Sequence, residues 1–231
     1  MDRIEKVILD ADDKSRERDF WKIVSRVKRD PKFTRMYAEQ IGRIDGAIFR
    51  QKAGILVPLK LGNFVEMAAT IFIIVISYGL ISSGVYTGIV ILACAFGLTV
   101  TLHPLAHYVV GRVLGIKFTF YFPDGPALIE PTIKTDYATY LTASPIKRAA
   151  MHAAGPIIST LVIALSLVMA IYIGAPPWTS WILLGLLSFN SIFEVLPPLL
   201  VKLGKKSFAK SDAYRVLREW KVHMSLEGHK S

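Results

Sequence analysis

Cysteine is almost absent from this chain. The 231 residues include one cysteine, Cys94, and it lies within a long apolar run. A single cysteine excludes an intramolecular disulfide and a metal site built from clustered cysteines.

Acidic residues are also scarce. The chain has 18 Asp and Glu against 28 Lys and Arg, a formal net charge of +10. Such an excess suits a nucleic acid or an anionic membrane surface. Because 52% of the residues are apolar and the mean hydropathy is positive, we expect the lipid bilayer as the partner and no nucleic acid.

Charge is nearly missing from four long runs. A helix of about 20 residues crosses the ~30 Å hydrocarbon core of a bilayer, and each run is about that long or longer. The runs are residues 64–82, 85–114, 149–173 and 178–201. The sequence therefore predicts an all-α, multi-pass membrane protein with about four transmembrane helices.

The basic residues predict how these spans are oriented. Fifteen Lys and Arg precede the first span, five lie around the loop between the second and third, and eight follow the fourth, which accounts for all 28. The connections at residues 83–84 and 174–179 carry none. Since cytoplasmic loops are enriched in Lys and Arg, we expect both termini and the central loop in the cytoplasm.

The segments outside the spans suggest a division into three parts. Residues 1–60 are expected to form a cytoplasmic helical segment, in which Asp30-Pro31 separates a first helix from a second one at 33–51. It would pack on itself or along the inner leaflet. Residues 61–217 form the transmembrane core, and residues 218–231 a cytoplasmic tail that continues an amphipathic helix.

A short cytoplasmic β-hairpin is predicted between the second and third spans. Residues 117–122 are rich in β-branched and aromatic side chains, and Pro123-Asp124-Gly125 is typical of a turn. Residues 127–133 would form the return strand. A plain loop is the alternative.

Two histidines near the inner end of the second span are candidate metal ligands. His103 and His107 are four residues apart, so on a helix they share one face and can bind one ion. They lie roughly 12–18 Å from the cytoplasmic end of the span, where polar side chains face the bundle interior rather than lipid. Simple hydrogen bonding to another helix is the alternative. Pro104 is expected to kink the helix or restart it.

The segment from His103 to Gly115 resembles the site-2 protease family of intramembrane zinc metalloproteases. The family motif H-E-x-x-H is matched at His103, His107 and the following Gly115, but Pro104 replaces the glutamate that acts as general base. A basic helix entry that leads to Ala154-Gly155-Pro156 resembles a second family element. The resemblance covers roughly residues 64–217.

This resemblance implies a zinc site with an aspartate as third ligand. One alignment places Leu200 at that position and removes the ligand, whereas another places Asp212 there. We favour Asp212 narrowly, although it is also a good residue for the start of a helix. His152 is either a polar neighbour of the site or, as we favour, an interfacial histidine.

Three functions remain open. The first, which we favour, is an inactive or impaired relative of these proteases that retains a metal site and binds single-span transmembrane proteins. The second is an active protease with a relocated base, either Glu194 or Glu66; Glu66 is otherwise expected to reach the interface. The third is a membrane binding or transport protein that reuses the fold. The sequence predicts neither the substrate nor the oligomeric state.

Overall fold

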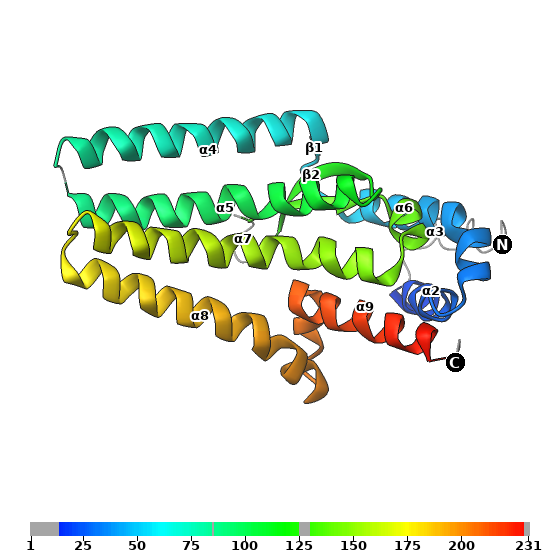
Figure 1. Cartoon of the computed structure of the whole chain (residues 1–231). Coiled ribbons are helices and arrows are strands. Elements are labelled where there is room, and N and C mark those ends of the chain that lie inside the picture. The colour runs from blue at the N-terminus through cyan, green and yellow to red at the C-terminus, as the bar shows by residue number, and fades with distance from the viewer. Residues whose placement is uncertain (1–13, 85, 125–129, 229–231) are drawn as a thin grey trace.

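Four long apolar helices lie side by side along most of the protein (Figure 1). The structure is a computed structural model that describes residues 14–84, 86–124 and 130–228. The four helices are α4 (Leu59–Ser82), α5 (Thr87–Val113), α7 (Pro145–Tyr172) and α8 (Pro177–Lys202). Each is long and apolar enough to cross a membrane, so the four predicted spans are confirmed apart from small shifts at their ends.

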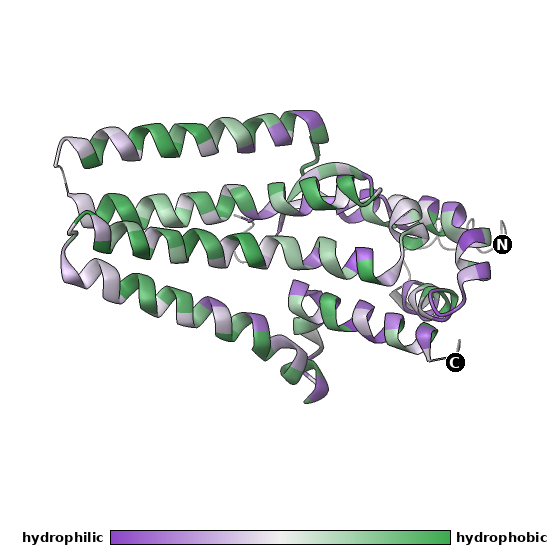
Figure 2. Cartoon of the chain, in the orientation of Figure 1, coloured by the Kyte–Doolittle hydropathy of each residue, from purple (hydrophilic) through white to green (hydrophobic). Residues whose placement is uncertain are grey.

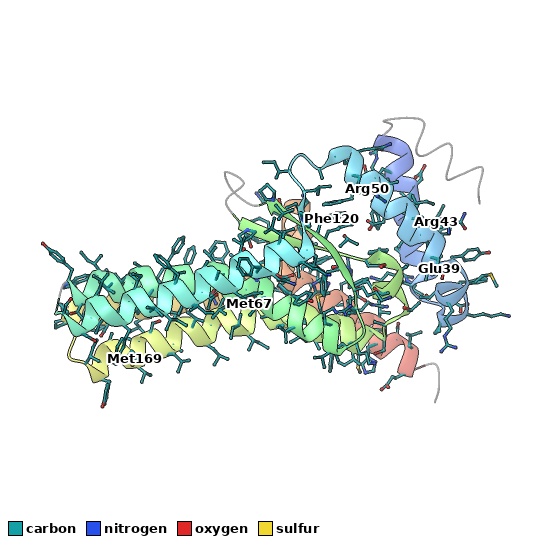
Figure 3. All side chains as sticks on the ribbon, turned by 90° about the horizontal axis from the view of Figure 1, so that it is seen from above. Glu39, Arg43, Arg50, Met67, Phe120 and Met169 are labelled. Atoms are coloured by element: carbon teal, nitrogen blue, oxygen red, sulfur yellow. The ribbon has the colours of Figure 1, made fainter. Side chains whose placement is uncertain are left out.

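Many large apolar side chains of this bundle are exposed, and hydrophobic residues run along all four helices (Figure 2). Met67 on α4 and Met169 on α7 are 56% and 48% exposed, while charged side chains such as Arg43 and Arg50 stand on a helix at the other end of the molecule (Figure 3). Monomeric soluble proteins rarely expose apolar surface on this scale. The fold is that of a multi-pass membrane protein.

Helix α5 runs through Pro104 without a break. The expectation that the helix restarts at Pro104 is therefore wrong. A proline removes only one backbone donor, and neighbouring helices in a membrane bundle can compensate for the freed carbonyl. As a result, His103 and His107 stay on one continuous helix, one turn apart.

A three-stranded antiparallel sheet follows α5 in the chain. Strands β2 (Phe118–Asp124) and β3 (Glu130–Thr135) form the predicted hairpin; its turn from Gly125 and the first residues of the predicted return strand lie outside the described residues. The sequence missed a third strand, β1 (Val57–Pro58), which pairs with the other edge of β2. Strand β3 is thus an edge strand.

The amino-terminal helices α2 (Lys14–Val27) and α3 (Pro31–Lys52) pack on a short helix, α6 (Tyr137–Thr142). Asp30 caps α3 as its position before Pro31 predicts, because its side chain accepts hydrogen bonds from two backbone N–H groups of the first turn. The buried core of this unit joins residues of all three helices: Phe20, Val24, Ala38, Ile41, Ile44, Ile48 and Leu141. The two amino-terminal helices therefore pack on each other, as one of the two expectations has it, and α6 adds a contact that the sequence did not predict.

The chain turns back after α8. Gly204 adopts a left-handed φ of 85°, the conformation that commonly ends a helix, and a short 3-10 helix, η2 (Lys206–Lys210), follows. The last helix, α9 (Asp212–Glu227), lies beside the first half of α7 (Figure 1). It runs across residue 217, and the three-part division of the chain stays a prediction.

Candidate metal centre

Three side chains from two distant parts of the chain meet beside α7. His103 and His107 come from α5, and Asp212 is the first residue of α9. One ligand atom from each lies within 4.8 Å of the others, a grouping that could hold a metal ion. Leu200, the competing position for the third ligand, lies within α8 and is not part of this group.

The Nδ1 atoms of the two histidines each have a hydrogen-bond partner on α7. His107 Nδ1 lies 2.7 Å from the carbonyl oxygen of Met151, and His103 Nδ1 lies 2.9 Å from the hydroxyl of Ser159. A carbonyl can only accept, so His107 Nδ1 carries the proton and the Nε2 of the neutral ring offers a lone pair. Such outer contacts also orient histidine ligands in metal sites.

The inner atoms are spaced as tetrahedral ligands would be. The two Nε2 atoms are 3.2 Å apart, and Asp212 Oδ2 lies 3.1 Å from His107 Nε2 and 3.4 Å from His103 Nε2. Zinc bonds of about 2.0–2.1 Å in a tetrahedron separate the ligand atoms by about 3.3–3.4 Å. Without a metal, a proton on a histidine Nε2 satisfies these contacts; with neutral rings, the two nitrogen lone pairs and the carboxylate form a donor set that fits a divalent metal.

Asp212 is ionised in this setting. Burial alone would raise the pKa of its carboxyl, but hydrogen bonds with His103, His107 and His152 outweigh burial and hold the pKa well below its ordinary value. Its second oxygen, Oδ1, lies 3.3 Å from His152 Nδ1 and 3.6 Å from Arg215 Nη1. One carboxylate oxygen therefore faces the two histidines, while the other is fixed by a histidine and an arginine.

Gly155 allows α7 to lie directly against the two histidine rings. A Cβ atom at this position would overlap His107 Nε2 and would lie 2.6 Å from His103 Nε2. Even alanine is therefore too large here without movement of both ligands. The Ala-Gly-Pro element singled out in the sequence thus has a direct role in the geometry of the cluster.

Two further residues of α7, His152 and Ser159, complete the surroundings of the three candidate ligands. His152 is buried and lies 3.0 Å from the hydroxyl of Tyr140 and 3.3 Å from Asp212 Oδ1, so it is a polar neighbour of the candidate ligands. Ser159 is the partner of His103.

A small cavity of about 70 Å³ lies beside the three candidate ligands. Its wall includes Pro104 and, from the edge strand β3, residues such as Glu130 and Ile133. Pro104 brings no acid or base to the cavity. Among the described wall residues Glu130 is the one carboxylate besides Asp212, and the sequence analysis did not select it.

The two intramembrane acids considered as relocated bases differ in position. Glu194 on α8 lies close enough to Asp212, His103 and His107 to interact with them electrostatically. Glu66 on α4 is buried, and its electrostatic neighbour is Tyr121 of the sheet. The structure thus brings Glu194, and not Glu66, toward the candidate metal centre.

Comparisons of the chain with protein-family models, with curated proteins and with solved structures found no match.

Proposed function

We propose that this chain is a zinc-binding membrane protein related to the site-2 proteases, impaired in hydrolysis, which binds transmembrane segments. The observation that carries the proposal is the convergence of His103, His107 and Asp212 on one point, at tetrahedral spacing, beside a cavity whose wall holds Pro104. The retained ligands support metal binding, and the proline supports a loss of catalysis.

Zinc in such a site lowers the pKa of bound water to about 7 and polarises carbonyl groups. Peptide hydrolysis also requires a group that takes the proton from the attacking water. Pro104 has no such group, and general-base catalysis typically contributes 10²–10⁴-fold to the rate. Bound peptide would therefore be held next to the metal and cut slowly or not at all.

The edge strand β3 supports an extended peptide as the ligand. Its residues Pro131, Thr132 and Ile133 line the cavity beside the candidate ligands. An extended chain can add to a free strand edge through main-chain hydrogen bonds. We propose that an unwound end of a single-span protein binds there, at the cytoplasmic side of the membrane.

Incubation of the full chain with zinc and a panel of single-span segments in detergent tests this function. We expect at least one segment to co-purify with the protein and to stay uncut. Efficient cleavage that a zinc chelator abolishes would contradict an impaired site. Absence of binding across the panel would contradict the proposal that the protein binds transmembrane segments.

An active protease with a relocated base is the second candidate, because Glu194 interacts electrostatically with the ligands and Glu130 lines the cavity. In that case Glu194→Gln or Glu130→Gln would lose chelator-sensitive cleavage and still bind metal. Glu66→Gln is the matched control and should cut like the wild type. Equal rates in all three variants would exclude both relocated bases.

The proposed orientation has a separate test, which the single cysteine makes simple. In a Cys94→Ser background, Ala175→Cys lies between α7 and α8, and Ser225→Cys lies in α9. We expect a membrane-impermeant maleimide to label Ala175→Cys in intact cells and Ser225→Cys only after lysis. The reverse pattern would contradict cytoplasmic termini.

A further inference from the structure

A buried ion cluster joins four separate elements at the end of the bundle. Its centre is Glu219 of α9, which is 0% exposed. The carboxylate accepts hydrogen bonds from Lys28 Nζ of α2 at 2.5 Å, Arg148 Nε of α7 at 2.7 Å, and both the Tyr140 hydroxyl of α6 and Arg218 Nη2 at 3.1 Å. One acid therefore accepts hydrogen bonds from a lysine, two arginines and a phenol.

The charges in this cluster depend on one another. Burial would raise the pKa of Glu219, but the charges of Lys28 and Arg148 outweigh burial and lower the pKa to about 2. The carboxylate is therefore ionised at neutral pH. Arg148 is fixed as well, since its Nη1 donates to the carbonyl oxygens of Leu141 and Ala143 at 3.1 and 2.8 Å. Without Glu219, the buried guanidinium of Arg148 would lose its counter-charge, which is strongly unfavourable.

Two connections lead from this cluster to the candidate metal centre. The first is α9 itself, because Glu219 and Asp212 are seven residues apart, about two turns, and so lie on the same face of the helix. The second is a chain of contacts: the Tyr140 hydroxyl donates to Glu219 and lies 3.0 Å from His152 Nε2, and His152 Nδ1 lies 3.3 Å from Asp212 Oδ1. Both connections end on the third candidate ligand.

We propose that Glu219 and Lys28 are positioning residues that fix α9 so that Asp212 reaches the metal. Asp212 needs such an anchor because it does not belong to a membrane-spanning helix and enters the site only through the docking of α9. Lys28 belongs to the amino-terminal helices, outside the part of the chain that resembles the protease family. Through this lysine the amino-terminal segment controls the affinity of the centre. The inference rests on the proposed metal site.

The test compares metal affinity in matched variants of the full chain in detergent. Zn²⁺ affinity is measured by competition with a chelator, and the absorption spectrum of bound Co²⁺ reports the ligand set. We expect Glu219→Gln and Lys28→Met to bind Zn²⁺ about 10–100-fold more weakly, the range seen when outer partners of ligands are changed, and to alter the Co²⁺ spectrum.

Controls come from the same two helices. Glu227 of α9 is largely exposed, and Lys22 of α2 forms an exposed pair with Asp19. Glu227→Gln and Lys22→Met should therefore keep wild-type affinity and spectrum. If Glu219→Gln fails to fold, the metal affinity of Lys28→Met tests the positioning role, because this variant keeps the ion pairs of Glu219 with both arginines. Faster hydrogen exchange of α9 in metal-free Lys28→Met, compared with Lys22→Met, is the expected second result.

The outcomes separate this inference from the proposed function. Metal in the wild type, with unchanged affinity and Co²⁺ spectrum in Glu219→Gln and Lys28→Met, would overturn the positioning role alone. Absence of metal from the wild type would overturn both. A loss of thermal stability without a change in affinity or spectrum would make the ion cluster purely structural and would also overturn the inference.

Discussion

Pro104→Glu is expected to raise chelator-sensitive peptide cleavage by about 10²–10⁴-fold over the wild type, the usual contribution of a general base. Pro104 lines the cavity next to His103 and His107, so a glutamate on the same helix position would face the same space. Removing the proline also returns a backbone donor to α5, and the helix should tolerate the change. Cleavage of a single-span segment, measured with zinc present, gives the result.

Two control variants make this gain interpretable. Pro104→Gln has nearly the same shape as Pro104→Glu but no basic carboxylate, and it should stay inactive. Pro104→Glu combined with His107→Ala should lose the gained activity, because it lacks a metal ligand. If Pro104→Glu binds metal and substrate and still does not cut, the explanation of impairment by the missing base would be wrong.

Gly155→Ala should reduce metal binding by at least tenfold, although it adds only one methyl group. The added Cβ would overlap His107 Nε2 and crowd His103 Nε2, so both inner nitrogens would have to leave their positions. The expected loss follows from the precision that a tetrahedral site requires. Metal titration of the purified variant measures it.

Gly185→Ala is the matched control for this substitution. Gly185 lies in the spanning helix α8, and a Cβ there would meet no atom within 4 Å. Alanine is also the better helix former, by about 1 kcal/mol. Gly185→Ala should therefore bind metal like the wild type and be no less stable. Equal binding by both alanine variants would contradict the close approach of α7 to the ligands.

The spans and the ligand pair could be predicted because their signals are local. Runs of apolar residues specify membrane-crossing helices, and a spacing of four places His103 and His107 on one face. Asp212 was preferred to Leu200 only because one of two possible alignments with the resembled family places it at the position of the third ligand. No local pattern shows that Gly204 and η2 turn the chain back, so its arrival at the histidines required the structure.

The residues that the sequence did not reveal belong to contacts between distant segments. Lys28 and Glu219 are 191 positions apart, and each alone resembles an ordinary surface charge. The sequence left His152 as either an interfacial residue or a polar neighbour of the site, because its contacts with Tyr140 and Asp212 depend on packing between distant segments. Strand β1 has two residues, one of them a proline, which gives no periodicity to detect.

Metal content of the purified full chain, wild type against His103→Ala, tests the central claim most directly. We expect about one zinc ion per wild-type chain prepared without chelators, and its loss in His103→Ala, because the imidazole supplies one of three protein ligands. A wild type that takes up no zinc when zinc is supplied, or a His103→Ala variant that retains it fully, would contradict a metal centre at His103, His107 and Asp212.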